Sequence, residues 1–281
     1  MRGQTRTWIV RVRGYGRVMT DFTDANLRGS RFERADLSGS QFWASDLAGA
    51  RFREVDLSGV VMRGVELGNV EINGYIENVT INGVDIGPLI EAELDRRYPD
   101  RSKMRPADPA GFREAWDILD RLWAQTVERA RRLPPGLLHE SVDGEWSFTE
   151  TLRHLTFATD AWVSRAILGD PSPWDPLGLP WDGMPDTPGV PRDREARPPL
   201  DTVLALRRMR MSTVREVIDK LTDESLAADT EPVEGPGWPQ PISYPVRTCL
   251  RVVLNEEWEH RLYAERDLAV LAARVTEGSD R

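Results

Sequence analysis

In the segment ADLSGSQFWASDLAGARFREVDL, residues 35–57, a large apolar residue returns at every fifth position. A small or β-branched residue stands two places before each of them. The full series is Phe22, Leu27, Phe32, Leu37, Phe42, Leu47, Phe52, Leu57, Met62, Leu67 and Ile72, and after a slip of one residue Ile76, Ile81 and Ile86. A period of five matches neither the 3.6 residues of an α-helix turn nor the two-residue repeat of a β-strand. It predicts a solenoid in which each five-residue unit forms one side of a coil and points two side chains inward.

The unit Ala-Asp-Leu-Ser-Gly at residues 35–39 resembles the pentapeptide-repeat family. This resemblance implies a short right-handed quadrilateral β-helix over residues 20–87, with four repeats in each coil. Some members of that family mimic DNA and bind type II topoisomerases, but those proteins are long, acidic and dimeric. This segment is short, and its arginines offset much of its acidic charge. We therefore expect a structural cap or docking platform, with a DNA-mimic protein as the alternative.

The composition limits the class of partner. The chain has 281 residues and a formal net charge of -9, which disfavours nucleic acid as a partner. Its single cysteine, Cys249, excludes an internal disulfide and a cysteine-based zinc ribbon, and so favours a cytoplasmic location. We expect no signal peptide, because the arginine-rich start lacks an apolar stretch, and no membrane span. A homodimer is compatible with these features.

The fold class expected for the whole chain is α+β with several domains. Residues 1–19 form an N-terminal cap or are disordered; Trp8, Val10 and Val12 alternate with polar residues, which is compatible with a short strand. After the repeats, residues 88–107 form a short helix and a linker. Residues 108–272 form a four-helix bundle of the up-down-down-up type, and residues 273–281 form a disordered tail.

Four stretches of the bundle carry helix signals. Ser147 and Glu150 form an S-x-x-E capping box at the start of the second helix, which extends to Leu168. The third helix covers residues 200–221, and the fourth opens near Pro245 and continues past Leu268. The stripes expected to be buried are Phe112, Trp116, Leu119, Trp123 and Val127 in the first helix and Leu206, Met209, Thr213, Val217 and Leu221 in the third.

Residues 171–199 contain nine prolines together with Trp174 and Trp181. Such a segment is neither a regular helix nor a central strand. Loops of this length inside a compact domain are often functional, so we expect a lid or the wall of a pocket. A plain connection across the bundle is the alternative.

The chain has three histidines, His139, His154 and His260. Glu256 and His260 are four residues apart on the fourth helix and therefore face the same way. His154 shares the inward face of the second helix with Phe157. Two imidazoles and one carboxylate that converge inside a bundle are typical of a three-ligand metal site that leaves room for water or substrate. A metal-free polar cluster, with a histidine bonded to a backbone carbonyl, is the alternative.

The segments GEWSFTETLRHL, residues 144–155, and NEEWEH, residues 255–260, resemble the DinB/YfiT-like superfamily. That resemblance covers roughly residues 108–272 and implies one divalent ion, held by a histidine of the second helix and a His-x-x-x-His pair of the last. His154 and His260 match two of these positions, whereas Glu256 stands where histidine is usual. The mycothiol-dependent maleylpyruvate isomerases, which this chain resembles, also use His, Glu and His. Zinc is the expected ion, with nickel, manganese or iron admissible.

Superfamily members of known activity are mostly thiol S-transferases and isomerases. The resemblance therefore implies transfer between a small-molecule electrophile and a low-molecular-weight thiol such as mycothiol, in detoxification or stress metabolism. Metal-dependent hydrolysis and a non-enzymatic interaction role are the alternatives. The sequence identifies no catalytic side chain: Cys249 is expected to be a buried structural cysteine. Asp160 and Glu257 are expected to contact solvent or a neighbouring helix.

Overall fold

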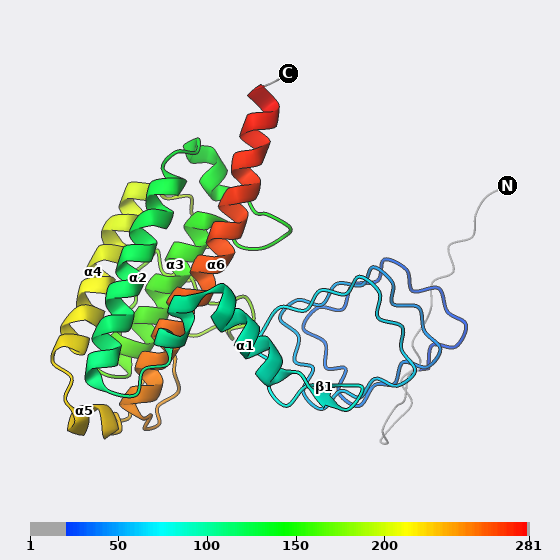
Figure 1. Cartoon of the computed structure of the whole chain (residues 1–281), viewed down its shortest axis with the longest axis horizontal. Helices are drawn as coiled ribbons and strands as arrows, with labels where there is room; N and C mark the ends of the chain where they lie inside the picture. Colours follow the sequence, from blue (N-terminus) through cyan, green and yellow to red (C-terminus); the bar gives the residue numbers. More distant parts are fainter. Residues whose placement is uncertain (1–20, 280–281) are drawn as a thin grey trace. The chain divides into compact units, whose positions relative to one another are not determined.

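The computed structural model describes residues 21–279 of the chain, so the cap or strand expected within residues 1–19 lies outside the described residues. The chain divides into two compact units, Met1–Ser58 and Gly59–Arg281. The described part of the first unit, residues 21–58, consists of repeats, drawn in blue in Figure 1. The second begins with the last repeats and continues into the helices.

The backbone of the repeats follows the five-residue period. Left-handed backbone conformations recur in the first unit at Asp24, Gly29, Arg34, Gly39, Ala44, Gly49 and Glu54, each two residues after an apolar position. In the second unit they continue through Gly74 and then, after the predicted slip, at Asn78 and Gly83. Within the units, the Ser40 N–H donates to the Leu37 carbonyl at 3.0 Å, and the Asp36 carboxylate accepts from the Ser38 N–H at 2.9 Å. The repeat and its change of phase are therefore confirmed in the backbone.

The expected inward placement of the apolar side chains is not found. Leu37 and Leu47 are 44% and 49% exposed, and Phe42 is 63% exposed. The one sheet among the described residues pairs β1 (Thr80–Ile81) with β2 (Val84–Asp85) in antiparallel register. A β-helix buries its interior because successive coils join through backbone hydrogen bonds. The bonds described for residues 21–58 lie within single turns, so the structure does not show a β-helix.

The second unit contains the helices. Its α-helices are α1 (Gly87–Arg97), α2 (Pro109–Ala130), α3 (Phe148–Thr159), α4 (Leu200–Asp219), α5 (Asp223–Ala227) and α6 (Val246–Ser279). Two 3₁₀ segments, η1 (Pro99–Met104) and η2 (Pro135–His139), precede α2 and α3, and a π-helical segment, η3 (Asp160–Arg165), continues α3. None of the described helices has the length and apolar character of a membrane span.

Helices α2, α3, α4 and α6 form the four-helix bundle (Figure 1). Arg131 at the end of α2 pairs with Asp201 at the start of α4, so these two helices are antiparallel. Arg129, also near the end of α2, pairs with Glu265 in the second half of α6, so α2 and α6 run the same way. Phe148 at the start of α3 shares a core cluster with Val203 near the start of α4, and Val163 of η3 shares one with Val214 in the second half of α4. Helix α3 therefore runs with α4, which confirms the up-down-down-up order. The α6 helix continues to Ser279, so residues 273–279 are helical where a disordered tail was expected.

The core consists of apolar side chains from all four helices. One cluster includes Phe112, Trp116 and Leu119 of α2, and these residues of the predicted stripe are at most 1% exposed. The predicted stripe of the third helix is confirmed in part: Leu206 and Leu221 are buried, but Met209 is 62% exposed. The buried face of α4 carries Val203, Leu204, Leu206, Arg207, Val214 and Ile218. This buried face includes the charged residue Arg207, so the apolar residues alone do not define it.

Candidate metal centre

His154 is placed by the start of α3. The Ser147 hydroxyl accepts a hydrogen bond from the Glu150 N–H at 3.3 Å, and the Glu150 carboxylate accepts one from the Ser147 N–H at 2.9 Å. This confirms the predicted capping box, an arrangement that satisfies two N–H groups at the helix start. With the helix start fixed, the ring of His154 lies on the buried face of α3, toward α6.

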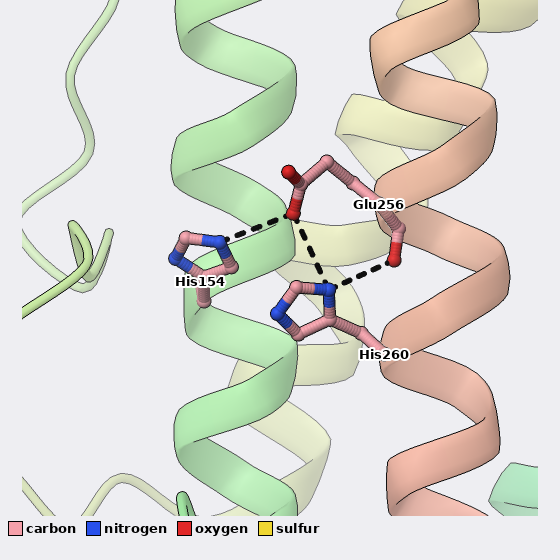
Figure 2. A group of neighbouring side chains, drawn as sticks. All are labelled: His154, Glu256 and His260. Atoms are coloured by element: carbon pink, nitrogen blue, oxygen red, sulfur yellow. Dashed lines mark hydrogen bonds and ion pairs between the residues drawn. The ribbon is translucent and has the colours of Figure 1, made fainter. Parts of the chain in front are cut away.

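Glu256 and His260 are on successive turns of α6, and both side chains point toward α3 (Figure 2). The Glu256 Oε2 lies 3.3 Å from His154 Nε2 and 3.3 Å from His260 Nδ1. The two imidazole rings are 4.8 Å apart between centroids. One potential ligand atom from each residue lies within 4.8 Å of the other two. The structure therefore brings together the three residues that the sequence analysis names.

The second nitrogen of His154 fixes the orientation of its ring. His154 Nδ1 lies 2.9 Å from the carbonyl oxygen of Leu179, which can only accept a hydrogen bond. Nδ1 therefore carries the proton, and Nε2 directs a lone pair at the Glu256 carboxylate. This is the arrangement that metal-binding histidines adopt, with one nitrogen toward the ion and the other bonded to an acceptor.

The pKa shifts favour a neutral imidazole and an ionised carboxylate. Burial, together with the neighbouring His154, lowers the pKa of His260 to about 4. Burial alone would raise the pKa of Glu256, but the neighbouring His154 and His260 lower it. At neutral pH these two groups are thus in the protonation states that bind a metal.

These donors fit a divalent ion. Ligand bonds of about 2.1 Å at a tetrahedral angle place two ligand atoms about 3.4 Å apart, close to the 3.3 Å between Glu256 Oε2 and His154 Nε2. His260 Nδ1 lies 3.0 Å from the carbonyl oxygen of Glu256 and so carries the proton, which leaves Nε2 as the donor atom of that ring. A lone pair of His154 faces a carboxylate oxygen, and a cation between them would remove their repulsion. The ring of Trp146 lies 4.5 Å from His154 and 5.9 Å from His260, and its buried indole N–H has no acceptor among the described residues. Among residues 21–279, His154, Glu256 and His260 are the group of three metal-binding side chains close enough together to hold an ion.

The loop of residues 171–199 reaches the centre through Leu179. It contains no helix or strand until α4 begins, as predicted. Its aromatic residues pack beside α3, with Trp174 stacked on Phe157 at 5.5 Å. A cavity of about 370 Å³ lies within the loop between Met184 and Arg192, and no ligand residue lines it. A pocket wall above the ligands stays a prediction; the contact that the structure gives between the loop and the ligands is the hydrogen bond between Leu179 and His154.

Two charged residues near the centre have helix-pairing roles. Glu257 forms two hydrogen bonds of 2.7 Å to Arg207 of α4, and both side chains are at most 3% exposed. Asp160 pairs with Arg210 at 2.6 Å. Contacts with a neighbouring helix are among those expected for Glu257 and Asp160, but the sequence does not indicate their arginine partners or the contacts of Leu179 and Trp146. For Trp146, its position directly before the capping box is the one local feature that indicates a place near His154.

Comparison with known proteins agrees with this architecture. A model of the DinB superfamily matches residues 118–264, more than half of the chain. Pentapeptide repeats, in eight copies, match residues 20–53 and 35–74. Neither the curated proteins nor the solved structures include a match. The superfamily is generally metal-binding, in keeping with the His154, Glu256 and His260 group, and the chain belongs to the DinB superfamily, with pentapeptide repeats ahead of its DinB domain.

Proposed function

We propose that the bundle binds one divalent ion through His154, Glu256 and His260 and transfers a group between a low-molecular-weight thiol and a small electrophile. The observation that carries the proposal is the donor set itself. Two imidazoles and one carboxylate converge from two helices, and within residues 21–279 their group includes no fourth carboxylate, histidine or cysteine. Structural zinc sites normally have four protein ligands, whereas catalytic sites have three and leave a position for water or substrate.

The residues around the ion have separate tasks in this proposal. His154 is oriented by the Leu179 carbonyl, and Glu256 supplies the negative charge that compensates part of the charge of the ion. His260 provides a neutral donor because burial keeps it unprotonated. When bound, the ion would lower the pKa of a coordinated thiol and so supply a thiolate at neutral pH. The indole N–H of Trp146 is a donor that can stabilise a negatively charged sulfur or oxygen atom beside the ion.

Zinc is the ion we propose, and mycothiol is the thiol. The mixture of nitrogen and oxygen donors suits zinc, although nickel, manganese and iron accept the same donors. Mycothiol follows from the His, Glu and His set, in which the chain is similar to the mycothiol-dependent isomerases. Cys249 has no part in the reaction, because it is fully buried and burial raises its pKa to about 11.

For the repeats we propose a quadrilateral β-helix that serves as a cap or docking platform. Its support is the match to eight pentapeptide repeats and the left-handed residue in every five-residue unit. The apolar side chains at every fifth position would then form its interior.

The transferase proposal is tested with metal-loaded protein, a panel of thiols that includes mycothiol, bacillithiol and glutathione, and a model electrophile. We expect thiol consumption above background with wild type and at least a tenfold lower rate with Glu256→Ala. Glu259→Ala is the matched control, because Glu259 is on the same helix but outside the ligand group. Equal background rates for wild type and Glu256→Ala with every thiol would remove the proposal. Product formed without any thiol would instead support metal-dependent hydrolysis.

A further inference from the structure

Arg153, the residue before His154, is buried in an unusual way. It is 0% exposed, and the hydrogen bonds described for its side chain go to backbone carbonyls rather than to carboxylates. Its guanidinium donates instead to backbone carbonyls of the loop of residues 171–199: Leu177 at 2.8 Å, Ala196 at 3.2 Å, and Asp193. A charged side chain with this burial is costly unless its donors are satisfied, so the loop must hold these carbonyls in place.

The same stretch of loop contacts the proposed metal ligand. The Leu179 N–H donates to the backbone carbonyl of Arg153 at 3.2 Å, and the Leu179 carbonyl accepts from His154 Nδ1 at 2.9 Å. Leu179 is therefore bonded through both of its backbone groups to two consecutive residues of α3. Leu177, two residues earlier, is bonded to the Arg153 side chain. Since the loop lacks secondary structure, these bonds determine where the Leu179 carbonyl lies.

We propose that Arg153 is a positioning residue for the metal centre. By holding the loop, it holds the Leu179 carbonyl that orients His154 and leaves Nε2 free to face Glu256. Partners of this kind, one bond away from a ligand, typically change metal affinity about 10-fold to 100-fold when removed. Binding of the ion and order in the loop are then coupled, and by linkage each stabilises the other. The inference rests on the proposed metal site but not on the transferase reaction.

Arg165 provides a matched control. It is 1% exposed, lies on η3, and also donates to backbone carbonyls, those of Pro171, Val233 and Gly235. It thus attaches the beginning of the same loop by the same chemistry. Its guanidinium makes no contact with Leu179 or with a ligand residue in the described hydrogen bonds. Arg153 and Arg165 therefore differ in their connection to His154 rather than in burial or type of partner.

The test compares wild type, Arg153→Met, Arg153→Lys and Arg165→Met. Zinc affinity is measured by competition with a chromophoric chelator, and stability by urea unfolding. We expect both methionine variants to lose stability, but only Arg153→Met to lose about 10-fold or more in zinc affinity. Arg153→Lys keeps the charge without the planar fork and should show an intermediate loss. If Arg153→Met does not fold, the comparison of Arg153→Lys with Arg165→Met carries the test.

A second readout is independent of zinc. In metal-free, ¹⁵N-labelled protein, His154 Nδ1–H should give a slowly exchanging signal, identified by its loss in His154→Ala. That signal should persist in Arg165→Met and be lost or exchange rapidly in Arg153→Met. Zinc affinity within twofold of wild type and an unchanged signal in a folded Arg153 variant would overturn the proposal. A wild type that binds no zinc would overturn the metal centre instead, while the Nδ1–H signal would still report whether Arg153 orients His154.

Discussion

The repeats and the helical bundle both have periodic apolar residues in the sequence, yet the structure buries only those of the bundle. Leu119 of the bundle is fully buried, whereas Leu47 of the repeats is 49% exposed. An α-helix satisfies its own backbone hydrogen bonds, so burial needs only another apolar face beside it. A repeat unit of five residues has no such internal ladder and depends on neighbouring coils. Apolar periodicity therefore predicts a buried core more securely where the element forms its backbone hydrogen bonds within itself.

The largest expected effect tests this comparison directly. If the repeats form the proposed β-helix, Leu47→Asp places an unpaired charge in its interior, which should cost more than about 4 kcal/mol and unfold the repeats. Far-UV circular dichroism and limited proteolysis would show loss of the repeats with the bundle intact. Ala48→Asp, one residue further along, is the control and should be tolerated. A Leu47→Asp protein with wild-type stability would instead support the exposed placement of Leu47.

The second-largest expected change in the free energy of unfolding comes from removing an ion pair, and it should differ between the two regions. Glu257→Ala leaves Arg207 charged and buried, and breaking a pair of this kind costs about 3–5 kcal/mol. Glu33→Ala in the repeats removes a pair with Arg31 in which both side chains are more than half exposed, so the effect should stay below about 1 kcal/mol. Urea unfolding of both variants measures the difference. Similar losses would mean that the buried pair is not a principal link between α4 and α6.

The candidate site and the buried ion pair also show which features could be predicted from the sequence. The ligand residues were predictable because Glu256 and His260 are four apart on one helix and His154 follows a capping box. Arg207 and Leu179 were not, for physical reasons. A charged residue on a buried face has the polarity of a surface residue until its partner is known, and Glu257 is 50 positions away from Arg207. The role of Leu179 depends on its carbonyl, which every residue carries, so no side-chain pattern identifies it.

A smaller effect is expected from the metal. Zinc at about 100 times its dissociation constant should stabilise the bundle by about 2.7 kcal/mol, because the ion binds the folded chain. His260→Ala should lose this increment, since one of three donors is gone. Thermal unfolding with zinc and with a chelator measures it, and the transition of the repeats serves as an internal reference that zinc should leave unchanged. His139→Ala, which removes a histidine outside the group, should respond to zinc like wild type. An equal zinc response in His260→Ala would exclude His260 as a ligand.

The smallest expected effect is a pH dependence that only the bundle should show. His260 has a folded-state pKa of about 4, below the value of about 6.5 in the unfolded chain. Between these values the unfolded chain binds a proton that the folded chain does not, so stability rises with pH across the interval. In chelator-treated protein, the contribution of His260 to the loss of stability between pH 6.5 and 4 should be about 2 kcal/mol. Asp160, whose pKa burial raises to about 6, contributes in the opposite direction over the same interval, so the comparison of wild type with His260→Gln isolates the contribution of the imidazole. His260→Gln should lose that part of the slope. The repeats contain no histidine, and hydrogen bonds from Ser38 and Ser58 lower the pKa values of Asp36 and Asp56, so their unfolding should be nearly flat over the same interval. An unchanged slope in His260→Gln would mean that burial of this imidazole is not what couples the bundle to pH.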